Sequence, residues 1–320
     1  MGRFIVRRLL QAIPTVLGIL VITFVLTRLS PSDPIALMYA NQPEVSPEQL
    51  ASIRETYGLN DPLPLQFVRW VGRVLTLDFG ESFFYHRPVI ELLAERIPNS
   101  LQLSLAGLLV AVLIGLPLGV LAALHRGRFP DHVIRVVSVS LNAVPDFFLG
   151  LLIILFFAIN LRWLPAGSMN VVGEQCTFCW DRGWHLIGPV LLAATAGIAA
   201  LPRFMRAEMI EILSQDYMRT ARSKGLRERV VVARHAFRNA LIPIVTLFGG
   251  VLTILVSGSV IIEVVFNWPG LGRLVFDAAN AKDYPIVQAA VLFASLLLVL
   301  SYILRDLAYA WVDPRIKLGR

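Results

Sequence analysis

Two cysteines, Cys176 and Cys179, form a C-x-x-C pair whose spacing allows specific chemistry. Such a pair can close a disulfide in an oxidising compartment, and it can bind a metal ion when further ligands join it. The nearest histidine is His185. A zinc site usually draws on a second pair of ligands, which is absent from the sequence around it. We therefore expect a disulfide or free thiols here, and no bound metal.

Polar and helix-breaking residues interrupt one long apolar stretch at Asn142, Pro145 and Asp146. A carboxylate within such a stretch is a candidate functional group, because exposing it to lipid costs several kcal/mol. We expect Asp146 to face a cavity through which a solute crosses and to attract a cationic group on that solute. The alternative is a carboxylate that pairs with a neighbouring subunit or is reached by water.

A later apolar stretch contributes two more candidates for the same path. Ser257 lies among glycines, and small residues suit close helix packing or the lining of a path. Glu263 follows at the outer end of this stretch. It either lines the outer mouth of the path or makes a structural pair with a basic residue, and the second role is favoured.

Motifs of several enzyme classes are missing. No G-x-x-x-x-G-K-[ST] loop occurs, so this chain is expected to bind neither ATP nor Mg²⁺. No histidine opens an H-E-x-x-H motif and no G-x-S-x-G elbow is present, which leaves an intramembrane enzyme as a remote alternative. A secondary transporter usually carries an internal repeat, and no persuasive one is found between the two halves.

Composition defines the class of protein. The chain has 320 residues, of which 56% are hydrophobic and 16% charged, with a mean hydropathy of +0.68. These values fit an all-α, multi-pass membrane protein rather than a soluble domain. The net charge of +7 does not indicate nucleic acid, because the basic residues cluster at the ends of apolar runs, where topology and anionic lipid explain them.

Six stretches are long enough to cross a hydrocarbon core of roughly 30 Å, which needs about 20 apolar residues. The second of them carries Gly115 and Gly119, a spacing that favours close contact between helices. The predicted spans cover residues 9–28, 100–124, 133–160, 186–208, 241–263 and 286–311.

The distribution of basic residues predicts the orientation of these spans. Arginine and lysine are frequent near the amino terminus, between spans two and three, between spans four and five, and in the tail, and they are sparser in the other connections. Because cytoplasmic loops carry an excess of these residues, both termini are expected in the cytoplasm. The first span follows Arg3, Arg7 and Arg8 without a cleavage site, so it is expected to remain as an anchor.

Residues 1–98 are predicted to hold the first span and a long outside region with short helices, and residues 99–320 the five remaining spans. Capping and turn residues predict one small helix between Ser46 and Gly58. An apolar stripe predicts an interfacial helix between Pro64 and Asp78. A third stripe opens at Pro88 and is expected to close before Pro98.

The most basic loop, residues 209–240, is expected to lie in the cytoplasm and to contain a helix. Between Arg219 and Arg238 it is rich in arginine and has one acid, Glu228. Ala221, Gly225 and Leu226 are predicted to form a small, flat patch, because alanine and glycine let another surface approach the backbone closely. This patch is expected to bind a partner protein.

The loop resembles the "EAA" loop of permease subunits of ABC importers, in which a glycine follows an alanine by four residues. Ala221 and Gly225 keep that spacing, while Arg219 and Thr220 replace the leading Glu-Ala. The segments DYMRTARSKGL, EVVFNWPGLGRL and YAWVDPRIKL resemble the peptide and nickel branch of the family, and the likeness covers nearly the whole chain except the cysteine-containing loop.

This resemblance implies a type I importer permease in a bacterial cytoplasmic membrane. It implies a homologous second permease, two ATPase subunits that hold ATP and Mg²⁺, and an extracytoplasmic substrate-binding protein. The coupling helix seated on the ATPase would contain Asp216, Tyr217, Ala221, Gly225 and Leu226. Di- or oligopeptides are the expected cargo, with nickel chelates, glutathione or other small solutes as alternatives.

Overall fold

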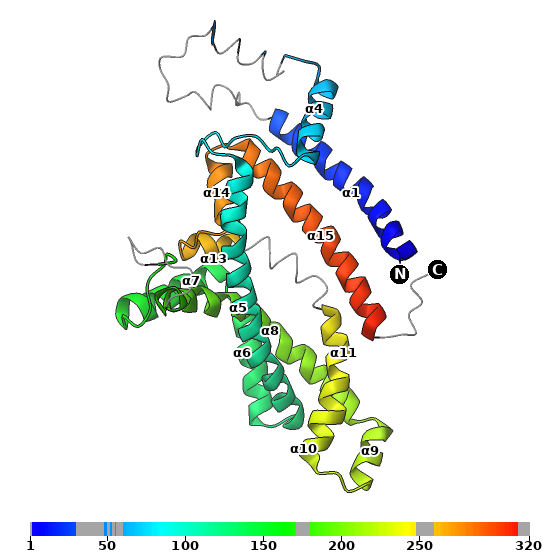
Figure 1. Cartoon of the computed structure of the whole chain (residues 1–320). Coiled ribbons are helices and arrows are strands. Elements are labelled where there is room, and N and C mark those ends of the chain that lie inside the picture. Colours follow the sequence, from blue (N-terminus) through cyan, green and yellow to red (C-terminus); the bar gives the residue numbers. More distant parts are fainter. Residues whose placement is uncertain are drawn as a thin grey trace.

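The structure is a computed structural model that describes residues 2–29, 48–49, 52, 55, 60–170, 180–247 and 259–312. These residues form an elongated bundle of helices (Figure 1). The elements are α1 (Gly2–Leu29), α4 (Leu63–Leu75), α5 (Val89–Leu124), α6 (Phe129–Ala143), α7 (Asp146–Ile153), the π-helix η1 (Ile154–Asn160), α8 (Trp180–Leu213), α9 (Asp216–Ser223), α10 (Glu228–Val230), the π-helix η2 (Val231–Phe237), α11 (Arg238–Leu247), α13 (Val260–Val265), α14 (Leu271–Asn280) and α15 (Tyr284–Val312).

The centre of the bundle is the close pair formed by α5 and α8. A Cβ atom added at Gly115 would lie 2.9 Å from the Leu201 Cβ, and one at Gly119 would lie 2.5 Å from the Met205 Cβ. Real side chains do not approach so closely, so these two glycines are what lets the helix backbones meet. The packing role predicted from the G-x-x-x-G spacing is confirmed within this chain.

Helix α5 is longer than the sequence suggested. A helix was expected to close before Pro98, but α5 runs unbroken from Val89 to Leu124 with Pro98 inside it. Proline removes one backbone donor and strains the preceding turn. The Asn99 side chain donates to the Glu95 carbonyl at 3.3 Å in this turn. The predicted boundary between residues 98 and 99 therefore falls inside one helix.

The third predicted span is not a single helix. Helices α6 and α7 meet at a bend of 103°, although together with η1 they have the length and composition of a span. Pro145 causes the break, because a proline forces the residue before it out of the helical region. Val144 is accordingly extended, with φ −91° and ψ 130°. The predicted span over residues 133–160 is thus a bent pair of helices, broken at the residues that the sequence marked as helix-breaking.

Three helices in the described part of the chain are individually long and apolar enough to cross a membrane: α5, α8 and α15. The bent pair gives a fourth candidate, and α1 holds a shorter apolar segment, Leu10–Leu26. The fifth predicted span, over residues 241–263, falls partly on residues 248–258, outside the described residues. The count of six is therefore not confirmed, although the spans at α5, α8 and α15 agree with prediction.

Helices α1, α4 and α15 form one side of the bundle, and α4 lies at the end opposite α9 and α10 (Figure 1). The predicted interfacial helix is present as α4. It packs on α1 through an aromatic group in which the Phe24 ring lies 5.3 Å from that of Phe67 and 5.8 Å from that of Trp70. The small helix expected between Ser46 and Gly58 lies almost wholly outside the described residues.

Candidate functional site

The basic loop folds into a compact helical hairpin at the end of α8. After Leu213 the chain turns at Ser214 and Gln215 and begins α9 with Asp216 in its first turn, where a carboxylate favours the positive end of the helix. Helix α9 ends at Ser223, so Gly225 and Leu226 lie just outside the helix in which they were expected. The φ of +77° at Gly225 lies in the left-handed region that glycine adopts most easily. The chain then returns through α10, η2 and α11 and packs against α8.

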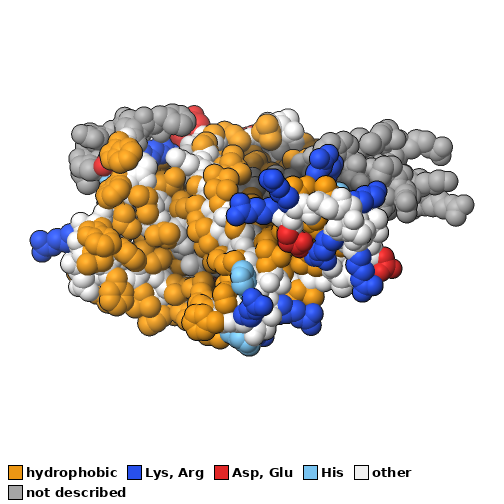
Figure 2. Space-filling view, turned by 90° about the horizontal axis from the view of Figure 1, so that it is seen from below, with side chains coloured by type: hydrophobic (Ala, Val, Ile, Leu, Met, Phe, Trp, Pro, Cys, Tyr) orange, Lys and Arg blue, Asp and Glu red, His pale blue; other side chains and the backbone are white. Residues whose placement is uncertain are grey.

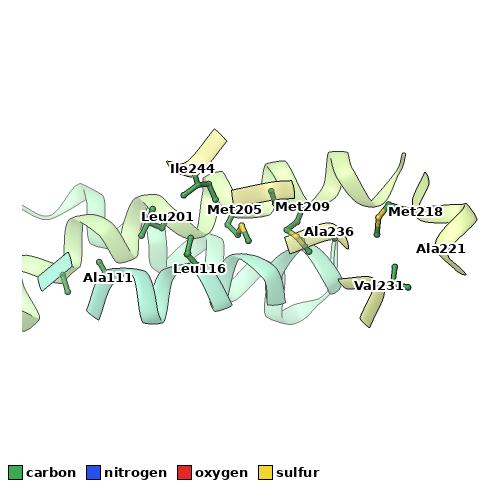
Figure 3. Packing of buried hydrophobic residues seen from close by; sticks show 13 residues of the cluster. Ala111, Leu116, Leu201, Met205, Met209, Met218, Ala221, Val231, Ala236 and Ile244 are labelled. Carbon is green, nitrogen blue, oxygen red and sulfur yellow. The ribbon is translucent and has the colours of Figure 1, made fainter. Parts of the chain in front are cut away.

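One face of α9 is buried in the protein's own core. Met218 and Ala221, three residues apart, point to the same side of the helix and contact a buried group of small and flexible residues (Figure 3). We call this group the inner cluster; it comprises Ala111, Leu116, Ala123, Ala194, Leu201, Met205, Met209, Met218, Ala221, Val231, Ala236, Ala240 and Ile244.

Burial of Ala221 corrects the prediction of an exposed patch. Its side chain is 8% exposed, so it does not belong to a surface on which a partner could rest. A small residue at this position lets α9 lie close to the helices beneath it. Ala221 and Gly225 keep the spacing of the family's loop. The rotation of α9 about its axis, however, points the Ala221 side chain into this chain's own core.

The other four residues of the expected coupling helix are exposed. Asp216 and Gly225 lie at the two ends of α9, and a Cβ at Gly225 would meet nothing within 4 Å. Tyr217 is 45% exposed and Leu226 is 41% exposed. Together they form a surface with apolar members, which we call the α9 surface: Asp216, Tyr217, Gly225 and Leu226.

Basic side chains surround the α9 surface. Figure 2 shows Lys and Arg gathered on the side of the lower face that the helical hairpin occupies, while hydrophobic side chains cover much of the rest. Arg222 donates to Glu228 at 3.1 and 2.9 Å, which ties α9 to α10. This hydrogen bond from Arg222 lowers the pKa of the Glu228 carboxyl below its usual value, against the opposing effect of its partial burial.

The expected path residues have different surroundings. Asn142 and Asp146 flank the break between α6 and α7 and are exposed on the surface of this chain, as is Pro145. Phe147 and Phe148, directly after them, are also exposed. The break therefore presents a carboxylate beside aromatic rings. Ser257 lies outside the described residues.

Glu263 is completely buried, with 0% of its surface exposed, so it does not line an open surface of this chain. The Ser100 hydroxyl donates to its Oε1 at 2.7 Å, and the backbone N–H of Arg273 donates to its Oε2 at 2.9 Å. Its carboxylate thus accepts a hydrogen bond from the first turn of α14, where the backbone N–H groups have no acceptor within the helix. The structural role is observed, with a hydroxyl and a helix terminus in place of the basic partner that was expected.

Glycines make room for this carboxylate. A Cβ atom at Gly270 would collide with the Glu263 carboxyl group, and one at Gly272 would lie 3.1 Å from its Oε2. In the sequence, these glycines were noted only within the segment EVVFNWPGLGRL, for its family resemblance. Their actual role is to admit a buried side chain from α13.

The structure also reveals a buried ion pair that sequence reasoning missed. Asp131, in the first turn of α6, is 0% exposed and accepts from Arg206 of α8 at 2.6 and 2.9 Å. The sequence did contain a signal, because Asp131 is the one acid between His125 and Pro145 and lies next to a basic turn.

The two cysteines lie outside the described residues. His185, considered as a partner for them, is buried in α8, and its Nδ1 lies 3.0 Å from the Gly167 carbonyl oxygen. Its Nε2 lies 3.6 Å from Asp181 on the next turn of the helix. The ring of His185 is therefore engaged within the fold.

Comparison with protein families matches residues 115–318 to the family described as "Binding-protein-dependent transport system inner membrane component". Residues 1–106 match its amino-terminal companion, described as "Binding-prot-dependent transport system membrane comp, N-term". The chain belongs to this family. It is accordingly a multi-pass component of the inner membrane and a non-catalytic subunit, with the ATPase on a separate chain.

Relatives of this permease match it from end to end. The chain is 40% identical over 318 residues to the oligopeptide transport system permease protein AppB of Bacillus subtilis, covering 99% of this chain and 100% of the relative. It is 41% identical over 317 residues to a probable peptide ABC transporter permease protein, y4tP, of Sinorhizobium fredii, with 99% and 100% covered. The glutathione transport system permease protein GsiC of Salmonella typhimurium is 39% identical over 317 residues, with 99% of each chain covered.

A solved structure has the same fold. An inward-facing form of the MetNI methionine ABC transporter matches with a TM-score of 0.51 at 18% identity, covering 70% of this permease and 97% of that chain. This likeness confirms the all-α fold of an ABC importer permease.

Proposed function

We propose that this permease forms, with a homologous second permease, the path by which an ATP-driven importer carries di- or oligopeptides into the cell. Two relatives of full length bear peptide or oligopeptide transport in their names, and a third is named for glutathione, itself a tripeptide. An importer of nickel chelates would use the same architecture, but none of these three names supports that cargo. An extracytoplasmic binding protein would deliver the peptide.

The α9 surface is the part of the chain that we assign to contact with the ATPase. The observation that carries this assignment is the two-sidedness of α9, whose Met218 and Ala221 are anchored in the inner cluster while Tyr217 remains exposed. A helix held in this way can transmit force from a partner to the bundle, because its underside is packed at interior density. ATP and Mg²⁺ would be bound by the ATPase subunits.

The transport mechanism that follows is alternating access. Closure of two ATPase subunits on ATP would push on α9, and α9 would carry the motion into α8 through the inner cluster. Such a mechanism needs two arrangements of the helices whose balance nucleotide and binding protein both shift. With both termini in the cytoplasm, as the basic residues predict, α9 would lie on the ATPase side.

Replacement of Gly225 by tryptophan tests the ATPase contact. Nothing lies within 4 Å of a Cβ atom at this site, so the indole of Gly225→Trp would stand in the α9 surface, and the backbone strain at φ +77° is one that the control variant shares. We expect co-purification with the ATPase to fall at least tenfold. A matched control is Gly80→Trp, since Gly80 also has φ +77° and open space but lies at the opposite end of the bundle. Undiminished ATPase binding and peptide uptake by Gly225→Trp would refute the assignment.

For the path, we propose that Asp146 attracts the amino group of the peptide. Its exposed position at the break between α6 and α7, beside two exposed phenylalanines, supports this role. The test compares uptake of a dipeptide with that of its N-acetylated form, using saturating binding protein and the Asp146→Asn variant. We expect the variant to slow uptake of the free peptide selectively. Equal slowing of both peptides, or loss of the second permease from the complex, would instead indicate a structural pairing between subunits.

A further inference from the structure

Asp131 is a charged residue that the fold has buried completely, at the inner end of the molecule. It lies in the first turn of α6, just after a turn in which Gly127 has φ +74°. Both carboxylate oxygens are engaged. The Gly127 N–H donates to Oδ2 at 2.8 Å, and the guanidinium of Arg135 lies 3.4 Å from Oδ1.

The strongest partner of Asp131 comes from another helix. Arg206 of α8 donates from Nε to Oδ1 at 2.6 Å and from Nη2 to Oδ2 at 2.9 Å. Two parallel hydrogen bonds between a planar guanidinium and a carboxylate fix orientation as well as distance. Helix α6 is thereby held at one rotation and one height along α8.

Arg206 lies on the part of α8 that supports α9. Its neighbour Met205 and the next-turn Met209 belong to the inner cluster, together with Met218 and Ala221 of α9 (Figure 3). The inner cluster joins this stretch of α8 to η2 and α9, with α9 packed mainly on η2 and η2 on α8, while Arg206 joins the same stretch to α6. Displacement of α9 would therefore reach this stretch of α8 through the inner cluster.

Helix α6 in turn leads to the candidate path. It ends at Ala143, and the bend of 103° at Val144 and Pro145 connects it to Asp146. A helix moves nearly as a rigid rod over such a length, so a shift at its first turn reappears at its last. Asp131 and the break thus mark the two ends of α6.

We propose that the Asp131–Arg206 pair couples α6 to α8, so that movement of α9 during the ATPase cycle is delivered to the break at Pro145. Both are positioning residues, acting through the helices and not on the peptide. This inference rests on the proposed function, since it requires an importer driven through α9.

A structural role alone would not require charges at these positions. Well-packed apolar residues often stabilise a protein as well as a buried ion pair does, because burying charges carries a desolvation penalty. Two parallel hydrogen bonds between Arg206 and Asp131 do something that apolar contacts do not. They fix the position of one helix relative to the other. That property matters where one helix has to follow another, which is the requirement of coupling.

The experiment uses the complete importer reconstituted in vesicles, and it measures peptide taken up per ATP hydrolysed. Asp131→Asn keeps the size of the side chain and removes its charge, and Arg206→Lys keeps the charge and removes the fork. The control is Arg203→Gln, because Arg203 lies one turn earlier on α8 and its Nε bonds to the Ala199 carbonyl of its own helix. The reversed pair, Asp131→Arg with Arg206→Asp, tests whether the two residues act together.

We expect Asp131→Asn and Arg206→Lys to bind the ATPase normally and hydrolyse ATP, while uptake per ATP falls about tenfold or more. Arg203→Gln should match the wild type, and the reversed pair should recover part of the loss. Wild-type uptake per ATP in both single variants would overturn the proposal. So would failure of all the variants to assemble, because the pair would then serve folding alone. If the unmodified permease binds no ATPase, the proposed function fails instead.

Discussion

The two ends of the permease are held together by different kinds of contact. At the end near α14, which the basic residues predict to be the outer one, buried hydrogen bonds join α5, α13 and α14 in addition to apolar contacts. At the opposite, predicted inner end, α8, η2 and α9 are joined in the inner cluster by apolar side chains. Hydrogen bonds depend on direction, and apolar contacts do not. The outer end is therefore built to keep one geometry, and the inner end can repack when α9 is pushed.

The outer contacts form a continuous group, which we call the outer network: Asn99, Ser100, Gln102, Arg182, Glu263, Trp268, Pro269, Leu271 and Arg273. Ser100 is its centre, since its hydroxyl donates to Glu263 and accepts from the backbone N–H of Leu271 at 2.7 Å. A satisfied buried network of this kind is costly to disturb, because each lost partner leaves another group unpaired.

The inner cluster consists of apolar side chains that can change their packing. It contains Met205, Met209 and Met218, and methionine adapts its shape more readily than other apolar residues. The Asp131–Arg206 pair beside it is directional, with Arg206 three residues before Met209 on α8. The contrast explains why a charge pair at this end is the feature on which coupling is proposed to depend.

The largest effect is expected from Glu263→Ala in the outer network. The change leaves the Ser100 hydroxyl and the Arg273 N–H buried without their acceptor, which costs about 4 kcal/mol when two such groups and a cavity are combined. Thermal unfolding of the purified permease should show a clearly lower midpoint. Glu263→Gln, which keeps one acceptor oxygen, should lose less. Equal stability of both variants and the wild type would mean that the network contributes little.

Gly119→Val should be next in size, at the contact between α5 and α8. Even a first carbon at Gly119 would lie 2.5 Å from the Met205 Cβ, and forcing the helices apart costs about 3 kcal/mol. Gly18→Val in α1 is the control, because nothing lies within 4 Å of that position. Expression and unfolding temperature should drop only for the first variant, and equal behaviour of the two would contradict the observed contact.

Ala221→Leu tests the side of α9 that faces the inner cluster. The larger side chain has to displace Met218 or Val231, and such overpacking costs about 2 kcal/mol. Thr220→Leu, on the exposed side of the same helix, should leave stability unchanged. If the inner cluster repacks as freely as its methionines suggest, the measured loss for Ala221→Leu will be smaller, which would sharpen the contrast with Glu263→Ala.

The smallest effect is expected from pH, at the exposed pair of Arg222 and Glu228. Because the pKa of Glu228 is lowered in the folded loop, the pair contributes stability that is present above the unfolded value of about 4.3 and is lost as pH falls through the lowered value. Hydrogen exchange of residues 222–230 should be unchanged between pH 8 and pH 6 after correction for intrinsic rates, and should quicken below about pH 4. In Arg222→Gln the pKa of Glu228 should return toward its ordinary value, so this transition should largely disappear.

Local patterns in the sequence predicted much of this architecture, and they failed where distant residues meet. The runs that became α5, α8 and α15 are long and apolar, so their helical, membrane-crossing character was evident. Pro98 and Pro145 looked alike as helix breakers, yet α5 passes through one and α6 stops before the other. Beside Pro98, Asn99 donates to the Pro269 carbonyl and Ser100 donates to Glu263, and these contacts with distant parts of the chain follow from no local pattern.

The site was predicted in part for the same reason. Tyr217, Gly225 and Leu226 were correctly expected on the surface, because a basic loop has to face water. Ala221 was misplaced, since the rotation of α9 depends on where α8 and η2 present Met209 and Val231. For Glu263 a structural pair was favoured over a place on the path, but no local feature shows that its partner would be Ser100, 163 residues away.

By itself, the amino-acid sequence determined the membrane class, the basic loop and the turn at Gly225, since hydrophobic length, charge and backbone freedom are properties of short segments. Only the tertiary structure decided which face of α9 is buried, that Glu263 caps α14 and that Asp131 meets Arg206 across 75 residues. The physical reason is that burial and ion pairing depend on which helices pack together, and that arrangement is set by the whole bundle.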